Sequence, residues 1–289
     1  MNYFTKEWYE LCQKTSAHLL LEEEEEAESF SEEYFQQLYN QKLMEWLVLQ
    51  EEVASCTFDD IYPAEMSPDF FNEEMSEEEI SVLRASYQKE REAAKETYIP
   101  PEPFDREKAS KQFQEAFIYN QEHIKNLLPE EILKKIADIR VFILDKASRQ
   151  VIDDVNGFCE DNEKIVKRTI KEYEKYYKKA LESFDRSIVE KINFHDCTII
   201  EVKQTEQFLT VLFNNSGGFT DISEMQFENY KIIKQEALLQ NSWWLYDEIY
   251  KVNGKYELHV LLQNENMDLV EFIVSAEHIS FKHNPENED

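Results

Sequence analysis

The hairpin predicted around Asn253-Gly254 carries residues whose types and spacing could do chemistry. An Asn-Gly pair between two strand-like runs is typical of a type I′ turn, because that turn needs φ > 0 at both positions. A two-residue turn pairs Val252 with Lys255, and the same register places Glu248 opposite His259. The Cβ atoms of directly opposed residues lie about 4.5–5.5 Å apart, so these two side chains can touch. A carboxylate that orients an imidazole is the unit of general-base chemistry and of many metal sites.

One face of this hairpin is predicted to be polar and aromatic. In a regular register its members are Trp244, Tyr246, Glu248, Tyr250, Glu257 and His259. Trp244 would then face Gln263, and the opposite face would be apolar core with Asp247 as its one exception. A slip of one residue would exchange the two faces. The Glu–His pair also fits an ordinary exposed ion pair worth about 0–1 kcal/mol, so a ligand or metal face and a plain surface both stay open.

A second candidate is the pair His195-Asp196, which directly precedes the first predicted strand. Metal-dependent phosphohydrolases use His-Asp pairs, but within helices and together with further His and Asp ligands that this chain does not supply. An Asp near the start of a strand commonly bonds its own backbone in a turn. The alternative function is a metal-dependent hydrolase or a ligand-binding protein that uses the polar face of the hairpin at 244–263, which His195 could join if folding brings it near.

The most conspicuous stretch of the chain is an uninterrupted run of glutamates. Its members are Glu22, Glu23, Glu24, Glu25 and Glu26. One interpretation is an acidic interaction patch for a basic protein partner, or a mimic of a nucleic-acid backbone. The other is a solvated helix face or a mobile helix end, which is how most like-charge runs behave.

A basic stripe is predicted on the last helix, which we expect at about 162–185. Its members recur at four- and three-residue steps: Lys164, Arg168, Lys171, Lys175 and Lys178. Residues at these steps share one side of a helix. The stripe would bind phosphate or an acidic protein, or it would face the acidic first section of the same chain.

Charge is unevenly distributed over the 289 residues, which contain 31 Lys and Arg against 61 Asp and Glu and have a net charge of −30. Residues 1–104 hold 7 basic and 26 acidic residues, residues 105–193 hold 18 of each, and residues 194–289 hold 6 and 17. Because phosphates would be repelled, we expect no direct binding to nucleic acid or to an anionic membrane.

Several patterns bear on location and enzyme class. No run reaches the roughly 18–20 apolar residues of a membrane span, and the acidic N-terminus does not resemble a signal peptide. The four cysteines form no CxxC pair, so a reducing cytoplasm is expected. The chain lacks the P-loop, GxGxxG, GxSxG, HExxH and EF-hand patterns. We therefore predict no cofactor and favour a non-enzymatic protein.

Glycine use predicts the fold class. All four glycines lie at or beyond position 157, and the long glycine-free stretch before them is rich in helix-forming residues. From about residue 194 the apolar period falls towards two, which predicts an antiparallel sheet of five to seven strands. The expected fold is α+β, with a helical domain at 1–193, a candidate sub-boundary near 100–104, and an antiparallel β domain at 194–289.

Five segments carry a resemblance to a known family: NYFTKEWY at 2–9, IADIR at 136–140, FHDC at 194–197, WLYDEIY at 244–250 and YELHVLL at 256–262. They resemble an uncharacterised family of cytosolic proteins from Bacillus-like Firmicutes, known only as a domain of unknown function. The last third is also similar to small β-rich domains of bacterial toxin-immunity proteins, which open with a comparable His-Asp-x-x-Ile strand. These resemblances imply a cytoplasmic interaction protein, immunity-like, and they assign no catalytic residue.

Overall fold

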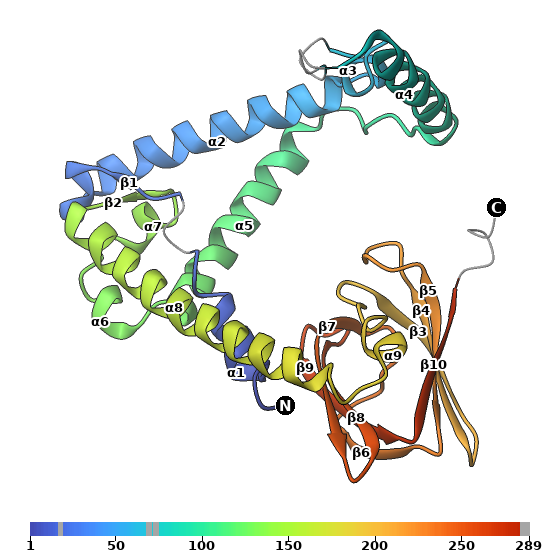
Figure 1. The fold of residues 1–289 in the computed structure, drawn as a ribbon. Helices are drawn as coiled ribbons and strands as arrows, with labels where there is room; N and C mark the ends of the chain where they lie inside the picture. Colours follow the sequence, from blue (N-terminus) through green and yellow to red (C-terminus); the bar gives the residue numbers. More distant parts are fainter. Residues whose placement is uncertain (17–19, 68–70, 72–74, 284–289) are drawn as a thin grey trace. The chain divides into compact units, whose positions relative to one another are not determined.

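The computed structural model describes the chain except residues 17–19, 68–70, 72–74 and 284–289. A helical N-terminal half precedes one antiparallel sheet, which confirms the predicted α+β class (Figure 1). The chain divides into two compact units, a helical unit at Leu20–Val155 and a β unit that joins Met1–Leu19 to Asn156–Asp289. A domain boundary at 193/194 stays a prediction. Among the described residues, no helix combines the length and the apolar character that a membrane crossing needs.

The helical unit is built around three long helices. Its elements are β1 (Glu22–Glu23), η1 (Glu25–Glu28), α2 (Glu32–Ser55), α3 (Phe58–Ile61), α4 (Glu77–Thr97), α5 (Arg106–Leu127), α6 (Glu130–Leu133), α7 (Ile139–Phe142), β2 (Lys146–Ala147) and the start of α8 (Arg149–Ala180). Side chains at the N-caps begin the long helices, since Ser31, Ser76 and Asp105 each accept a hydrogen bond from a backbone N–H of the first turn. Ser76 and Glu79 form a capping box at the start of α4.

The β unit contains a single eight-stranded sheet among its described residues. Its elements are α1 (Lys6–Cys12), the rest of α8, α9 (Arg186–Val189), β3 (Thr198–Gln204), β4 (Phe208–Asn214), β5 (Ile222–Glu228), β6 (Lys231–Gln235), β7 (Trp243–Val252), β8 (Lys255–Gln263), β9 (Leu269–Ala276) and β10 (His278–His283). The strand order is β10-β5-β4-β3-β7-β8-β9-β6, and the sheet curves so that β10 also contacts β8 (Figure 1). The predicted count of five to seven strands was wrong. Asn229, at φ 50°, lies in the turn between β5 and β6.

The concave side of the sheet encloses the main apolar core. Strands from both ends of the order contribute buried side chains to it: Ile199, Leu209, Met225, Phe227, Ile249, Leu258, Val260, Phe272 and Ile279. The other side of the β7–β8 hairpin is covered by the N-terminal segment and by α8. Phe4 packs on Tyr173 of α8 with 4.7 Å between ring centroids, and the Tyr176 hydroxyl donates a 3.0 Å hydrogen bond to the Ile249 carbonyl.

Helix α8 begins earlier than the sequence predicted. It starts at Arg149 rather than near 162, and it runs through Gly157. A glycine inside a helix costs only about 1 kcal/mol relative to alanine, and buried Val151, Val155 and Cys159 on the same helix offset that amount.

Candidate functional site

The predicted polar face of the hairpin is occupied by the protein's own N-terminal segment. Glu248 is fully buried, and its carboxylate accepts backbone N–H bonds from Asn2, Tyr3 and Phe4 at 2.8, 2.8 and 2.6 Å. The Tyr250 hydroxyl donates a fourth hydrogen bond at 2.5 Å. Burial, followed by this bond to a carboxylate, raises the pKa of Tyr250 far above its ordinary value. Glu248 therefore holds the N-terminal segment and has no oxygen available for a ligand.

His259 lies opposite Glu248 in the predicted register but bonds to another partner. Its Nε2 atom lies 2.7 Å from a carboxylate oxygen of Glu257, two residues away on the same strand. The Nδ1 atom is buried and has no hydrogen-bond partner among the described residues. Because a carboxylate can only accept, Nε2 carries the hydrogen of the bond to Glu257. The predicted Glu248–His259 pairing is confirmed as strand register and is not seen as a side-chain contact.

A β-bulge changes the far end of the hairpin. The predicted register holds from Val252–Lys255 to Tyr246–Leu261, and then shifts by one residue so that Trp244 pairs with Leu262. The predicted Trp244–Gln263 pair was therefore wrong, and Trp244 lies in the core instead of on the polar face. A bulge inserts one residue into a strand and re-aims its neighbours, here at Leu245.

The same bulge gives Asp247 a partner in its own strand. Residues three apart normally lie on opposite faces of a strand, but the extra residue puts Trp244 and Asp247 on one face. The Trp244 indole Nε1 donates a 2.9 Å hydrogen bond to Asp247 Oδ2. Burial raises the pKa of Asp247 to about 6, and the charge of Glu248 adds to the rise, whereas the Trp244 bond and His195 oppose it.

His195 completes a small pocket beside Asp247. Its Nδ1 atom bonds to the Leu245 carbonyl at the bulge, and because a carbonyl can only accept, Nδ1 carries the hydrogen. Its Nε2 atom lies 3.7 Å from Asp196 Oδ2, too far for a hydrogen bond. The pocket measures about 260 Å³, and its lining residues are Ile192, Asn193, His195, Leu245, Tyr246 and Asp247.

The turn that carries His195 is fixed from two sides. Asp196 N–H bonds to the Trp244 carbonyl, and Trp244 N–H bonds to the Cys197 carbonyl, both at 2.9 Å. The loop after β4 packs against the same turn. A Cβ atom added to Gly218 would lie 2.4 Å from Cys197 Sγ and 3.0 Å from the His195 carbonyl oxygen. Glycine is therefore required there for close approach.

The structure brings only part of the predicted site together. His195 and Tyr246 line one pocket, whereas Glu248 binds the N-terminal segment and His259 bonds to Glu257 and packs on Tyr250. No three or more His, Cys, Asp or Glu side chains of the described residues are arranged to hold a metal ion. Asp247 appeared in the sequence only as an exception in an apolar face. The sequence feature that could have identified Asp247 as a site residue is a carboxylate on the core-facing side of the predicted hairpin.

The glutamate run is only partly neutralised by neighbouring cations. Glu22 pairs with Lys146 at 2.6 Å and Glu23 with Arg149 at 3.3 Å, beside the parallel β1–β2 pair. Glu24 and Glu26 instead interact with each other, which raises the pKa of Glu24 and lowers that of Glu26.

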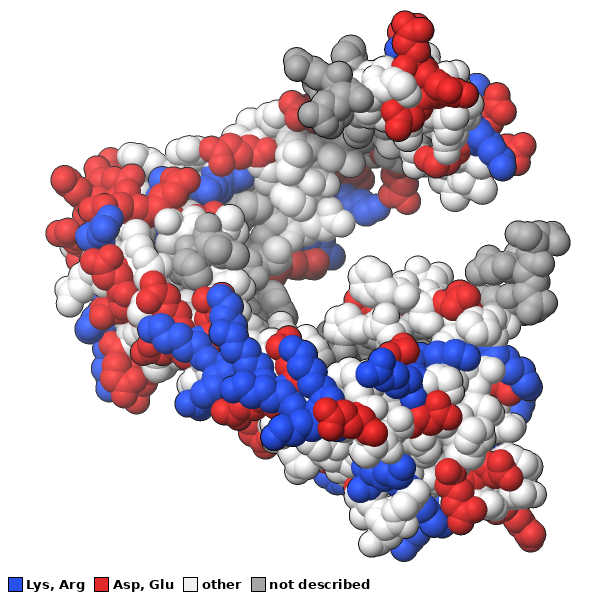
Figure 2. Space-filling view, viewed as in Figure 1, with Lys and Arg blue, Asp and Glu red and all other residues white. Residues whose placement is uncertain are grey.

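The basic stripe on α8 is exposed on the surface of the β unit, and Lys and Arg side chains gather along it (Figure 2). Lys164 pairs with Asp161 and Glu160 of the same helix. Arg168, Lys171, Lys175 and Lys178 make no ion pair with any described residue. Whether they face the acidic first section of the chain stays a prediction.

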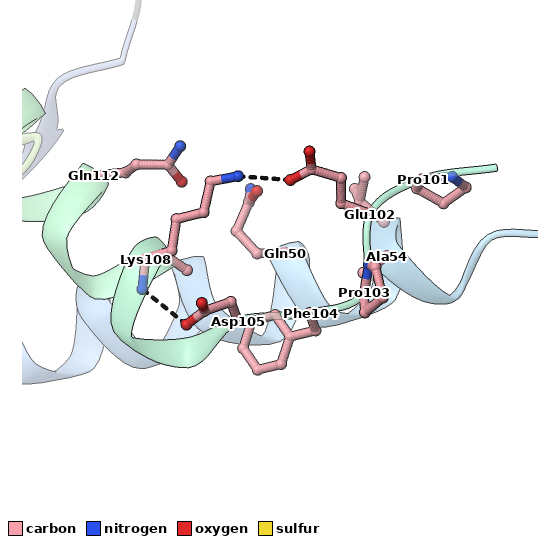
Figure 3. Close-up of a pocket in the computed structure, with 11 residues that line it drawn as sticks. Gln50, Ala54, Pro101, Glu102, Pro103, Phe104, Asp105, Lys108 and Gln112 are labelled. Atoms are coloured by element: carbon pink, nitrogen blue, oxygen red, sulfur yellow. Dashed lines mark hydrogen bonds and ion pairs between the residues drawn. The ribbon is translucent and has the colours of Figure 1, made fainter. Parts of the chain in front are cut away.

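A pocket of about 400 Å³ lies between the end of α2 and the start of α5 (Figure 3). Its cation, Lys108, pairs with Glu102 at 2.6 Å, while the Lys108 N–H bonds to the N-cap side chain of Asp105. These charged groups satisfy one another, and the remaining polar lining consists of Gln50 and Gln112. The pocket offers no group poised for acid–base chemistry.

Comparisons with known proteins give a family match and nothing more specific. A family model described as a protein of unknown function matches residues 104–273, which is more than half of the chain. The match includes every residue of the His195–Asp247 pocket and excludes the glutamate run. No curated protein matches the chain, and no solved structure matches it either.

Proposed function

The chain belongs to the DUF4085 family of proteins of unknown function, and from its own geometry we propose that it is a non-enzymatic protein that binds a basic protein partner. The contact surface is the acidic patch Glu24, Glu25 and Glu26. The observation that carries the proposal is a contrast within the glutamate run. Glu22 and Glu23 pair with Lys146 and Arg149, whereas no Lys or Arg of the described residues forms an ion pair with the patch.

The crowding of carboxylates in the patch favours a cation as the missing partner. Like charges held close together repel, and the interaction with Glu26 raises the pKa of Glu24. An ammonium or guanidinium group from a partner would offset this repulsion and form charge-assisted hydrogen bonds with the carboxylates. Long-range attraction by the −30 charge would speed the encounter.

The narrower form of the proposal is an immunity-like role in a bacterial cytoplasm. Its support is the His195-Asp196-x-x-Ile199 opening of β3, which is similar to the opening strand of toxin-immunity domains. A basic toxin is then the kind of partner that the acidic patch would neutralise.

The test is a pull-down from an extract of the source organism, read by quantitative mass spectrometry. The wild type is compared with a patch variant, Glu24→Gln/Glu25→Gln/Glu26→Gln. The matched control is Glu45→Gln/Glu51→Gln/Glu52→Gln, which removes the same charge from exposed positions on α2 in the same unit. We expect a basic protein to be retained by the wild type and the control, lost from the patch variant, and released as salt rises.

Two results would contradict the proposal. One is equal retention by the patch variant and the wild type, and the other is retention that salt does not weaken. If DNA competes with the protein for the captured partner, the basic partner is a DNA-binding protein and the acidic patch acts as a nucleic-acid mimic.

A further inference from the structure

The His195–Asp247 pocket has more hydrogen-bond acceptors than the protein itself satisfies. Asp247 Oδ2 takes the Trp244 indole hydrogen, while Oδ1 receives no hydrogen bond from a described residue. The bond to Leu245 fixes the ring hydrogen of His195 on Nδ1, which leaves Nε2 as a hydrogen-bond acceptor. Nε2 also receives no hydrogen bond from a described residue. Two acceptors, one of them a carboxylate, therefore line the same pocket without donors.

The pocket also carries negative charge without a counter-ion. Among the described residues, no Lys or Arg forms an ion pair with Asp247, and the only ionic contact of the Asp196 carboxylate is the His195 ring at 3.7 Å. Glu248 lies close enough to raise the proton affinity of Asp247 further. The Asp247 charge also raises the pKa of Tyr173 and Tyr177 of α8. Both side chains are uncharged hydroxyls at neutral pH, so neither serves as a counter-ion. A partly buried carboxylate in such surroundings favours a cation.

We propose that this pocket binds an ammonium group, with the Asp247 carboxylate as its counter-ion and His195 Nε2 as a second acceptor. An ammonium group is a compact cation with three N–H donors and no acceptor, which complements a pocket that is rich in acceptors. Tyr246 lines the same pocket, and its ring lies 5.1 Å from the His195 ring between centroids. A metal ion is a poorer match, because the described residues provide no set of three ligands.

The ammonium group can come from a lysine side chain of a protein or from a free small amine. Both have the same recognition chemistry, so the test uses one probe of each kind. The proposal is independent of the acidic patch Glu24–Glu26, which lies in the other unit. Failure of either proposal would leave the other standing.

The experiment follows the histidine ring ¹⁵N resonances of the full-length protein at constant ionic strength, with His195 assigned by His195→Gln. The probes are propylammonium and Nα-acetyl-lysine amide, and tetramethylammonium serves as a cation without N–H donors. We expect saturable shifts of His195 Nε2 with the first two probes and none with the third. Tighter binding of the lysine probe than of propylammonium would identify a protein side chain as the natural source. Equal binding of the two probes would identify a free amine as the source.

Two isosteric variants distinguish binding in the pocket from non-specific attraction of a cation to an acidic protein. Asp247→Asn should weaken propylammonium at least about tenfold, because it removes the counter-ion. Asp196→Asn removes the same charge from the neighbouring exposed residue, at a φ of 65° that asparagine also adopts, and should change the affinity less than about twofold. Equal weakening by both variants, equal shifts with tetramethylammonium, or no shift in the wild type would each overturn the proposal.

Discussion

Glu248 connects the start of the chain to a strand almost 250 residues later, and it does so through a buried charge. A buried carboxylate is tolerated only when hydrogen bonds replace the lost water. Three backbone N–H groups and one hydroxyl fill that role here. Bonds to a charged group are individually stronger than neutral ones, and removing one acceptor leaves a buried donor unsatisfied.

We therefore expect Glu248→Gln to lower the free energy of unfolding by about 1.5–3 kcal/mol. The glutamine amide keeps the shape of the side chain, but its NH₂ group faces backbone N–H donors. Urea unfolding followed by far-UV circular dichroism measures the loss. Glu206→Gln is the control, because Glu206 is exposed on the β3–β4 turn. Equal stability of the two variants would show that Glu248 does not anchor the N-terminal segment.

Asp247 predicts a pH dependence whose sign is opposite to that of most carboxylates. Its pKa is raised to about 6 in the folded state by burial, against about 3.9 in an unfolded chain. The folded state therefore binds the proton more tightly, and stability falls as the pH rises from about 4 to about 6. A rise of roughly two pKa units corresponds to about 3 kcal/mol.

The comparison of wild type with Asp247→Asn isolates this effect from all other titrating groups. Relative to the variant, the wild type should lose about 2 kcal/mol of unfolding free energy between pH 4 and pH 7. Urea unfolding at several pH values measures the difference. Parallel pH profiles for the two proteins would mean that Asp247 titrates near the ordinary value.

At the scale of elements, the sequence predicted what local chemistry decides. Asn253-Gly254 set the turn, and the register from Val252 to Tyr246 followed from it. The bulge at Leu245 was not predicted, and the histidine that bonds its carbonyl comes from another segment of the chain. The same limit explains the misplaced Trp244 and the hidden role of Glu248, whose partners lie at the far end of the sequence.

Two glycines in different elements should respond to alanine in opposite directions. Gly218→Ala places a Cβ atom against Cys197 and the His195 turn, so we expect a loss of about 1–3 kcal/mol and altered His195 resonances. Gly157 lies inside α8 with nothing within 4 Å of a built Cβ atom, so Gly157→Ala should gain about 0.5–1 kcal/mol. Thermal and urea unfolding measure both. A gain at 218 would show that the loop does not pack on the turn.

For the whole molecule, the net charge of −30 governs the long-range electrostatics. Acidic side chains gather over α4 and the start of α2, and most ion pairs of the described residues are exposed (Figure 2). Exposed pairs contribute only about 0–1 kcal/mol each, so screening them loses little. Self-repulsion among unpaired carboxylates acts over longer distances and opposes the compact state.

Salt should therefore stabilise this protein at neutral pH. The Debye length falls from about 30 Å at 0.01 M to about 8 Å at 0.15 M, which removes repulsion between distant carboxylates before it affects close pairs. We expect the melting temperature to rise by at least about 2–4 °C over this range, the shift that corresponds to 1 kcal/mol in a large domain. The internal control is the same experiment at pH 5, close to the isoelectric point of about 4.6, where little net charge remains and the salt effect should nearly vanish. A melting temperature that falls with salt at pH 7 would mean that ion pairs outweigh self-repulsion, and a rise of equal size at both pH values would point to an effect of salt on apolar burial.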